Sequence, residues 1–341
     1  MTKKYKAGIF GVGAAAIEYI NAINNNPIST VVAAVGRDKT KTERKLAGLG
    51  IEGCEVLENC DEMINRKDID IIVNTGPHQM HAEETIKAAN AGKHVLFEKP
   101  AGMSLEEVVK VYETVKRCGI KTQQGTPILL NPYVRNVLKL IDEGLIGKIF
   151  YIQAGNAHEL GPWWNGWTWG GNKRVGGPSA ALVTGIHAIA FLMRCAGEVE
   201  EVSGYQTWGH RDDFEYAPTF TASLKFKNAA VGSTYSTYEN KSPYSRNFII
   251  HGTKGSIIDD KYYLEELFPG QTGWQKFTTI MPDSGAVSHH AFKELVGDFI
   301  DAIENDRPAL VNIEETLKVH EVCFAITEAI ETGKIVKLPL V

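Results

Sequence analysis

Strands and helices alternate at short spacing over about the first 125 residues of the chain. The aliphatic run DIDIIVNTG is almost unbroken, as is typical of a strand that is buried on both faces. We expect strands at 5–10, 29–35, 68–76, 94–97 and 120–125, with helical stretches between them. In the helix expected over 104–119, Ser104 is the N-cap, Glu107 stands at the capping-box position and Gly119 ends the helix. This alternation predicts a doubly wound sheet of parallel strands, with right-handed crossovers.

The pattern changes after residue 125. Long strands then follow one another with no helix between several of them, at 148–159, 198–209, 219–228, 229–239 and 247–260. Such a succession predicts a mostly antiparallel sheet. We expect helices at 131–144, 178–196, 288–304 and 313–332. The sequence therefore predicts two domains, an α/β Rossmann domain over 1–125 and an α+β domain with a large open sheet over 126–341.

A glycine-rich loop follows the first expected strand. GVGAAA, residues 11–16, fits the pattern G-x-G-x-x-A, and it stands between a strand and a helix, as a dinucleotide-binding loop requires. Gly11 permits the tight turn, Gly13 lets the backbone approach a pyrophosphate, and Ala16 lets the helix and strand pack closely. The helix N-terminus then faces the phosphates. We predict that Gly11, Gly13, Ala14, Ala15 and Ala16 bind the cofactor.

The end of the second strand bears on which nicotinamide dinucleotide is bound. An acidic residue there would hold the ribose hydroxyl of NAD, but Gly36 stands at that place and Arg37 follows it. A guanidinium binds a 2′-phosphate in bidentate fashion, and Lys39 and Lys41 lie close by. Asp38 is an alternative partner for the ribose. We therefore predict an NAD(P) cofactor, with NADP favoured over NAD.

The composition excludes several classes of partner. The formal charge of −5, from 41 acidic and 36 basic residues, gives no reason to expect nucleic acid or an anionic membrane. No run approaches the ~20 apolar residues that span a bilayer. The five cysteines have neither metal-ligand nor redox-motif spacing, so we expect reduced thiols, no metal and a cytoplasmic protein.

Several segments, in this order along the chain, resemble the glucose–fructose oxidoreductase/inositol dehydrogenase family, often called Gfo/Idh/MocA. They are GVGAAA at 11–16, the block 75–100 ending GKHVLFEKP, NPYVRNVLKLIDEGLIGKI at 131–149, GIH at 185–187 and HGTKGSI at 251–257. The 75–100 block is the most specific of them. The resemblance implies an NAD(P)-dependent oxidoreductase that transfers a hydride between nicotinamide and a secondary alcohol of a sugar, polyol or sugar derivative.

The stretch Glu98-Lys99-Pro100 leaves a strand at the edge where a parallel sheet presents its ligand crevice. We expect Lys99 near the nicotinamide, bonded to a substrate hydroxyl and to the ribose. Glu98 is also expected at the cofactor, where it orients Lys99 or offsets its charge. In proteins resembling this one the Lys–Pro bond is often cis. The further residues that the resemblance implies at the cofactor are Thr75, Gly76, Pro77 and His78. For His81 we leave open a functional role or a place at a helix start.

The resemblance also implies that His187 faces the nicotinamide and serves as the general base, while Lys99 stabilises the developing alkoxide. These two roles could be exchanged. Relatives usually carry an aspartate four residues before this histidine, where this chain has Val183, and often one three residues after it, where it has Ala190. A proton relay through an aspartate is therefore excluded. We also predict that Thr184 contacts the substrate.

Two further stretches bear on the substrate. Many relatives carry two arginines at the positions of Ile128 and Leu129, so their loss argues against an anionic group there. Four of the six tryptophans fall within residues 163–169, where they could form a substrate wall or a subunit contact. The substrate-binding residues predicted here are Trp163, Trp164, Lys173 and Arg174.

Two alternatives to a dehydrogenase remain open. Some relatives use a tightly held NAD to oxidise a sugar transiently and then eliminate a substituent, with no net redox change. A non-catalytic sugar or nucleotide sensor on the same fold is the other. As in relatives, the open sheet of the second half is expected to pair with partner subunits in a homodimer or homotetramer.

Overall fold

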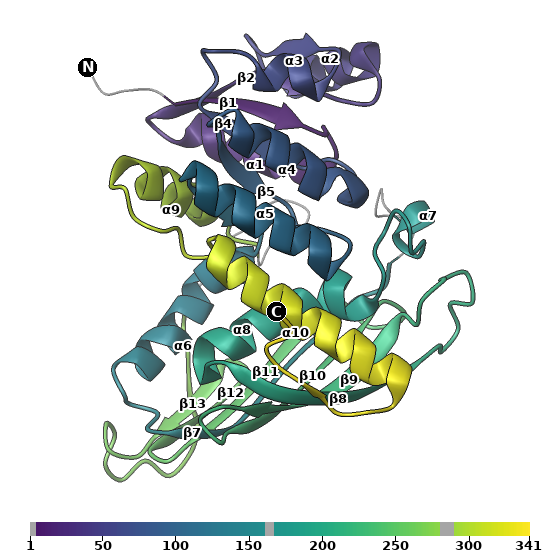
Figure 1. The fold of residues 1–341 in the computed structure, drawn as a ribbon. Helices are drawn as coiled ribbons and strands as arrows, with labels where there is room; N and C mark the ends of the chain where they lie inside the picture. Colours follow the sequence, from purple (N-terminus) through teal and green to yellow (C-terminus); the bar gives the residue numbers. More distant parts are fainter. Residues whose placement is uncertain (1–4, 161–166, 280–289) are drawn as a thin grey trace. The chain divides into compact units, whose positions relative to one another are not determined.

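The computed structural model describes residues 5–160, 167–279 and 290–341 (Figure 1). The chain divides into two compact units, Met1–Pro127 with Ser284–Leu317 and Ile128–Asp283 with Lys318–Val341. The division of the sequence into domains at residue 125 stays a prediction. The compact units differ from it chiefly in that Ser284–Leu317 belongs with the first unit.

The first unit is built on a parallel sheet of six strands in the order β3-β2-β1-β4-β5-β6. Every pair of neighbours is parallel, which confirms the predicted doubly wound sheet. The order reverses between β1 and β4, and ligands of such sheets bind at this switch point. The strands are β1 (Tyr5–Phe10), β2 (Ser29–Val35), β3 (Glu55–Leu57), β4 (Ile71–Asn74), β5 (His94–Phe97) and β6 (Thr122–Gln124).

Helices connect these strands, and they pack in pairs. Within the unit α1 contacts α9, and α4 lies along α5 (Figure 1). The strands between them are almost fully buried, as their aliphatic sequences predicted. The helices of this unit are α1 (Ala14–Asn25), α2 (Lys39–Gly48), α3 (Cys60–Ile64), α4 (His81–Asn90), α5 (Leu105–Cys118) and α9 (Phe292–Glu304).

The helix α5 begins and ends where its sequence indicates. The Ser104 hydroxyl accepts a hydrogen bond from the Glu107 N–H, and the Glu107 carboxylate accepts one from the Met103 N–H at 2.7 Å. These bonds satisfy N–H groups that the first turn of a helix leaves unpaired. Gly119 ends the helix in the left-handed conformation at φ 65°.

The second unit contains a sheet of nine strands in the order β14-β13-β12-β11-β7-β10-β9-β8-β15. It is mostly antiparallel, as predicted, although β7 and β10 pair in parallel. The strands are β7 (Ile149–Ala157), β8 (Val199–Thr207), β9 (Thr219–Phe226), β10 (Val231–Thr237), β11 (Ser245–Gly252), β12 (Gly255–Ile258), β13 (Lys261–Leu264), β14 (Gln275–Lys276) and β15 (Val336–Lys337).

The prediction of a single strand over 247–260 was wrong. Its residues form the antiparallel hairpin of β11 and β12, because the chain turns at Thr253 and Lys254. The aliphatic residues before and after the turn were joined into one strand, although Gly252 and Gly255 on either side of it were an available signal.

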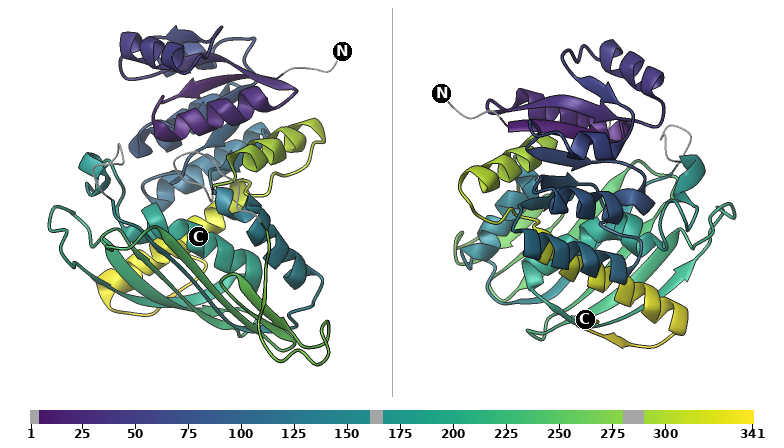
Figure 2. Two further views of the ribbon diagram at one scale, coloured as in Figure 1. Left: turned by 180° about the vertical axis from the view of Figure 1, so that it is seen from behind. Right: turned by 45° about the horizontal axis from the view of Figure 1, so that its top comes forward.

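One face of the nine-stranded sheet is packed against helices. Along β9 and β10 buried and more exposed residues alternate, as in a sheet with one covered face. The helix α8 (Ile186–Ala196) contacts β7 and β10 and lies along the sheet in Figure 2. The remaining helices are α6 (Pro132–Asp142), α7 (Trp167–Gly170) and α10 (Ile313–Thr332), which begins in the first unit and ends in the second. Among all the helices described, none is long and apolar enough to cross a membrane.

Candidate active site

The glycine loop after β1 is held against the end of β4. The Thr75 hydroxyl donates to the Gly11 carbonyl at 2.7 Å and lies 3.1 Å from that of Phe10. Gly11 has φ 86°, and a Cβ there would stand 2.5 Å from the Gly76 Cα. Only glycine fits this turn without strain. The predicted residues Gly11, Thr75 and Gly76 are therefore brought together at the switch point of the sheet.

The rest of the loop opens the helix α1. Gly13 is the N-cap residue, and no side chain caps this helix end. A Cβ on Gly13 would meet no atom of the described residues within 4 Å, whereas Ala16 is fully buried. Gly13 and Ala14 are exposed. An exposed helix N-terminus with unshielded N–H groups suits the pyrophosphate of a dinucleotide, so these residues fit the predicted cofactor.

At the end of β2, Gly36 stands where an acidic residue would bind the ribose of NAD, and α2 packs closely against it. A Cβ on Gly36 would stand 2.1 Å from the Thr42 hydroxyl oxygen, so α2 passes close to this position. The Asp38 carboxylate caps α2 by accepting the Lys41 N–H at 2.9 Å. The Lys39 ammonium pairs with Glu58 at 3.0 Å. The Arg37 side chain is exposed.

Sequence reasoning missed a basic residue of α2 at this site. The Lys45 ammonium donates to the carbonyl oxygens of Val12 at 2.8 Å and Gly13 at 3.1 Å. Burial lowers the pKa of Lys45. This contact ties α2 to the glycine loop and leaves a cation beside it. In the sequence Lys45 is one of several basic residues on a charged helix, so no local signal marked it.

The stretch Glu98-Lys99-Pro100 leaves the sheet at the carboxyl end of β5. The Glu98 N–H donates to the Asn74 carbonyl at 2.9 Å, and the Lys99 N–H donates to the Glu98 carboxylate at 3.1 Å. The Lys99–Pro100 bond is cis, as the resemblance implied. Burial raises the pKa of Glu98, while the Lys99 ammonium and the Tyr19 hydroxyl act to lower it. A carboxylate and an ammonium therefore lie together at the edge where β4 and β5 end.

His81 connects two segments of this edge. Its ring is fully buried, with Nδ1 2.7 Å from the Pro100 carbonyl oxygen and Nε2 2.9 Å from that of Gly76. A neutral imidazole donates one of these bonds, and an imidazolium donates both. Burial lowers the pKa of His81, and this effect is larger than that of the two contacts with carbonyl oxygens, which raise it. His81 thus bridges backbone segments at the start of α4, while the predicted cofactor residue His78 lies 5.4 Å from it, ring to ring.

In the second unit, His187 and Thr184 occupy neighbouring turns. Thr184 lies in a π-helical turn, Ala181–Gly185, directly before α8 and His187. Such turns are frequent at functional sites. Both side chains are buried, and the Thr184 hydroxyl accepts a hydrogen bond from the Asn156 amide at 2.5 Å. The Tyr244 hydroxyl donates to the side-chain Oδ1 of Asn156 at 2.7 Å. The sequence analysis missed Asn156 of β7, which bonds Thr184 directly, and Tyr244 just before β11, which bonds Asn156.

The positions where relatives differ from this chain are apolar and buried. Val183 lies against Gly177, where a Cβ would stand 2.2 Å from the valine Cγ2. Gly177 has φ 139°, so a glycine is required there on two grounds. Ala190, Ile128 and Leu129 are also buried.

The loop before the π-helical turn carries two of the predicted substrate residues. Lys173 and Arg174 are exposed, and the Lys173 N–H donates to the Glu215 carboxylate at 2.8 Å. The Asn172 amide donates to the same carboxylate at 2.7 Å. Glu215 therefore holds the turn in place. Trp163 and Trp164 lie outside the described residues.

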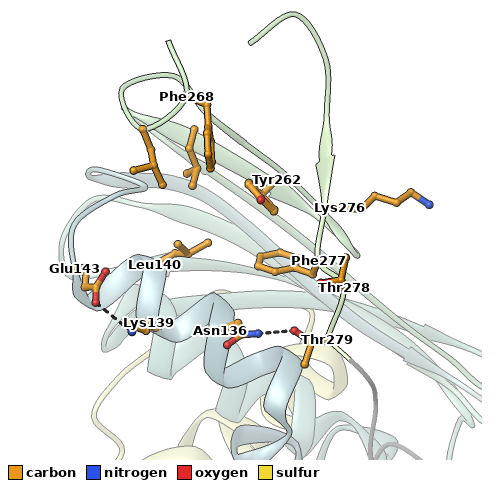
Figure 3. A pocket seen from close by; sticks show the side chains of 12 residues that line it. Asn136, Lys139, Leu140, Glu143, Tyr262, Phe268, Lys276, Phe277, Thr278 and Thr279 are labelled. Carbon is orange, nitrogen blue, oxygen red and sulfur yellow. Dashed lines mark hydrogen bonds and ion pairs between the residues drawn. The ribbon is translucent and has the colours of Figure 1, made fainter. Parts of the chain in front are cut away.

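The second unit also has a hollow of about 300 Å³ between α6 and the strands β13 and β14 (Figure 3). Aromatic rings of Tyr262, Phe268 and Phe277 face it. None of the residues predicted to bind cofactor or substrate lines it. We do not assign it to the active site.

Two family models match the chain. One, described as "Oxidoreductase family, NAD-binding Rossmann fold", matches residues 5–126. The other, "Oxidoreductase family, C-terminal alpha/beta domain", matches residues 138–338. The chain belongs to the Gfo/Idh/MocA family. It is accordingly an NAD(H)-binding oxidoreductase, and the resemblance found in its motifs is confirmed.

Several characterised members of the Gfo/Idh/MocA family are similar to the chain. The levoglucosan dehydrogenase of Pseudarthrobacter phenanthrenivorans is 28% identical over 60% of this chain and 59% of its own length. The scyllo-inositol 2-dehydrogenase (NAD(+)) of Bacillus subtilis is 24% identical over 99% of this chain and 97% of its own. The 2,7-anhydro-N-acetylneuraminate hydratase of Escherichia coli is 26% identical over 74% of this chain and 67% of its own.

A solved structure of this family has the same fold. It is a levoglucosan dehydrogenase in complex with NADH and levoglucosan, with a TM-score of 0.89 over 99% of this chain and 100% of that one. At 21% sequence identity, this likeness establishes the fold of the chain.

Proposed function

We propose that this oxidoreductase transfers a hydride between a nicotinamide dinucleotide and a secondary alcohol group of a sugar or polyol. The observation that carries the proposal is the position of Lys99, which leaves the carboxyl end of β5 beside the switch point of a dinucleotide-binding sheet. The names of the two similar dehydrogenases, which act on levoglucosan and scyllo-inositol, support this substrate class.

The glycine loop binds the cofactor in this proposal. The exposed N–H groups at the start of α1 bond the pyrophosphate, and Gly13 leaves room for it. Thr75, Gly76, Pro77 and His78, which follow β4, contact the ribose and nicotinamide. When bound, the nicotinamide supplies the hydride chemistry.

Lys99 and His187 act on the substrate hydroxyl. The Lys99 ammonium donates a hydrogen bond to the oxygen and stabilises the negative charge that develops on it. His187 accepts the hydroxyl proton during oxidation and returns it during reduction. Thr184, which is fixed by Asn156, orients the substrate, and Lys173 and Arg174 bind its outer hydroxyl groups. From the sequence alone, we propose that Trp163 and Trp164 form either a substrate wall or a subunit contact.

We further propose that NADP is preferred over NAD. Gly36 offers no carboxylate for a ribose hydroxyl, and the Asp38 carboxylate is engaged as the cap of α2. Arg37 is exposed and, unlike Lys39, has no acidic partner among the described contacts. A guanidinium in this position suits a 2′-phosphate.

The working form is proposed to be a cytoplasmic homodimer or homotetramer. All five cysteines are unpaired, as in proteins of reducing compartments. The nine-stranded sheet carries exposed apolar side chains, among them Phe150, Tyr205 and Val231, and a partner subunit would cover them.

The experiment is a turnover assay, read by nicotinamide absorbance, with NADP or NAD and a panel of sugars and polyols. We expect turnover with one substrate class and NADP ahead of NAD. Lys99→Met should lower kcat by ~100-fold or more, since it removes a charged donor to the developing oxyanion. Arg37→Ala should raise the KM for NADP far more than that for NAD, whereas the exposed control Arg44→Ala should change neither.

A redox-neutral reaction is the second candidate, because one of the similar proteins is named a hydratase. In that case the cofactor would stay bound through purification and each turnover would leave its redox state unchanged. Product analysis by mass, with no net change in nicotinamide absorbance, would favour this candidate over the dehydrogenase. Binding of a sugar with no turnover in either assay would contradict both.

A further inference from the structure

We propose that Tyr19 is a positioning residue that acts on Lys99 through Glu98. The Tyr19 hydroxyl, on α1, donates to the Glu98 Oε1 at 2.7 Å. The Glu98 Oε2 accepts the Lys99 N–H at 3.1 Å. The carboxylate thus joins the helix that follows the glycine loop to the residue proposed to act on the substrate. This inference rests on the proposed role of Lys99.

Tyr19 is held firmly in this position. Its side chain is fully buried, and the Phe292 ring of α9 packs edge-on against it with 5.0 Å between centroids. Gly125, after β6, completes the enclosure. A Cβ on Gly125 would stand 2.5 Å from the Tyr19 hydroxyl oxygen and 2.7 Å from the Glu98 Oε1. Glycine is the residue that leaves room for the bond, so α1, α9 and β6 together fix its geometry.

Glu98 is equally constrained. Its N–H donates to the Asn74 carbonyl at the end of β4, and its two carboxylate oxygens are divided between the Tyr19 hydroxyl and the Lys99 peptide. Without the hydroxyl, one oxygen of a carboxylate in a desolvated site would lose a charged hydrogen bond. Such a loss is among the costlier ones in a protein interior.

The protonation states suit this arrangement. Burial and the neighbouring Glu98 raise the pKa of Tyr19 well above its ordinary value, so the hydroxyl remains a donor at neutral pH. Burial also raises the pKa of Glu98, and the Tyr19 bond is one of the contacts that lower it. Removing the hydroxyl therefore favours the neutral acid. The Lys99 ammonium would then lose the negative charge beside it, and the orientation of the Lys99 peptide would loosen.

The test compares Tyr19→Phe with Tyr112→Phe, a control on α5 of the same unit. In Tyr19→Phe we expect kcat to fall by roughly 10-fold or more, as for a lost bond to a charged group, with the cofactor KM within about two-fold. Measured in the direction of reduction, where His187 acts as the acid and does not set the acidic limb, that limb of the kcat profile should move to higher pH, because Glu98 must be ionised and its pKa rises. Tyr112→Phe should leave kcat and the profile unchanged. An unshifted acidic limb in Tyr19→Phe would overturn the inference.

A double-mutant cycle makes the test sharper. If Tyr19 acts through Glu98, the kcat losses of Tyr19→Phe and Glu98→Gln should not multiply in the double variant; multiplying losses would overturn the inference. Gly125→Ala, which displaces the same bond while keeping both partners, should shift the acidic limb in the same direction. If Tyr19→Phe fails to fold, the shift of the acidic limb in Gly125→Ala provides the test instead.

Lys99→Met separates this inference from the function on which it rests. A Lys99→Met enzyme that keeps its kcat would overturn the proposed role of Lys99, and with it the role of Tyr19. An inactive Lys99→Met enzyme beside an unshifted Tyr19→Phe profile would overturn the role of Tyr19 alone.

Discussion

Single buried side chains hold the backbone of the candidate site in place. His81 is the clearest case, since its two ring nitrogens contact the carbonyl oxygens of Gly76 and Pro100. One of these carbonyls belongs to the segment proposed to contact the cofactor, and the other follows Lys99 directly. Lys45 acts in a similar way on the glycine loop. These residues do not need to touch a substrate to determine where the reacting groups lie.

His81 should make the stability of the protein depend on pH. Burial holds its pKa below the ordinary value of 6.5, so the unfolded chain takes up a proton that the folded chain refuses. The folded state is therefore favoured above about pH 6.5 and loses stability as the pH falls below it, by about 1.4 kcal/mol for each unit of pKa shift. Urea unfolding midpoints measured from about pH 7.5 down to about pH 5.5 should fall steeply for the wild type and less for His81→Gln.

The control for this prediction is His251→Gln, at a partly exposed histidine of β11. Its midpoints should follow those of the wild type across the same range. If His81→Gln lost stability as steeply as the wild type, proton uptake at His81 would not be the cause.

The sequence predicted residues whose roles are local and missed those whose roles depend on distant contacts. Gly11, Ser104 and Gly119 are recognisable because a tight turn or a helix end needs that residue type in that place. Tyr19 and Glu98 are 79 residues apart, and Lys45 is 33 residues from Val12. No periodicity or spacing in the sequence records such pairings. His81 was noticed, but its two backbone partners were not predictable.

At the level of elements, the glycine loop before α1 must make a tight turn and must also leave room for a ligand. Gly11 and Gly13 meet these two requirements separately. Gly11 is required by the fold, since any side chain there would meet Thr75 and Gly76. Gly13 faces open space, and the protein itself would tolerate a larger residue. We propose that Gly13 instead leaves room for the approach of the cofactor.

Alanine substitutions should separate these two requirements. Gly13→Ala should keep the urea midpoint of the wild type but raise the Kd for NADPH by ~10-fold or more, which is about 1.4 kcal/mol. Gly11→Ala should lower the midpoint as well, because a left-handed alanine costs about 1–2 kcal/mol and its Cβ also collides with the backbone of Thr75 and Gly76. Fluorescence titration with NADPH and urea unfolding measure the two effects. Equal losses of stability in both variants would contradict this division.

Elements with a strong pattern were predicted well, whereas the two-residue strands and the π-helical turn were not. The strands β1, β2 and β4 and the helix α5 follow from their apolar runs and caps. The strands β14 and β15 have two residues each and exist only through pairing with a neighbour. The π-helical turn before α8 was also missed, because its residues are as apolar as those of the helix that follows.

At the scale of the whole molecule, residues proposed for one reaction belong to two compact units. The cofactor loop, Glu98 and Lys99 belong to the first, and Thr184 and His187 belong to the second. Each unit has its own sheet and its own buried core. A ligand stabilises the part of a protein that it contacts in the native state, by about 2.7 kcal/mol at 100 times its Kd. Cofactor and sugar should therefore protect different segments of the chain.

Amide hydrogen exchange measures this directly. Saturating NADPH should slow exchange in segments 11–16 and 75–78 of the first unit, because the N–H groups of the loop become bonded to phosphate and local opening now requires release of the ligand. Adding a sugar substrate to the NADPH complex should further slow exchange in 181–187 of the second unit. The Gly13→Ala variant is the control, and both effects should require an NADPH concentration higher by the factor of ~10 or more that separates the two Kd values. Cofactor protection confined to the second unit would contradict the assignment of the glycine loop.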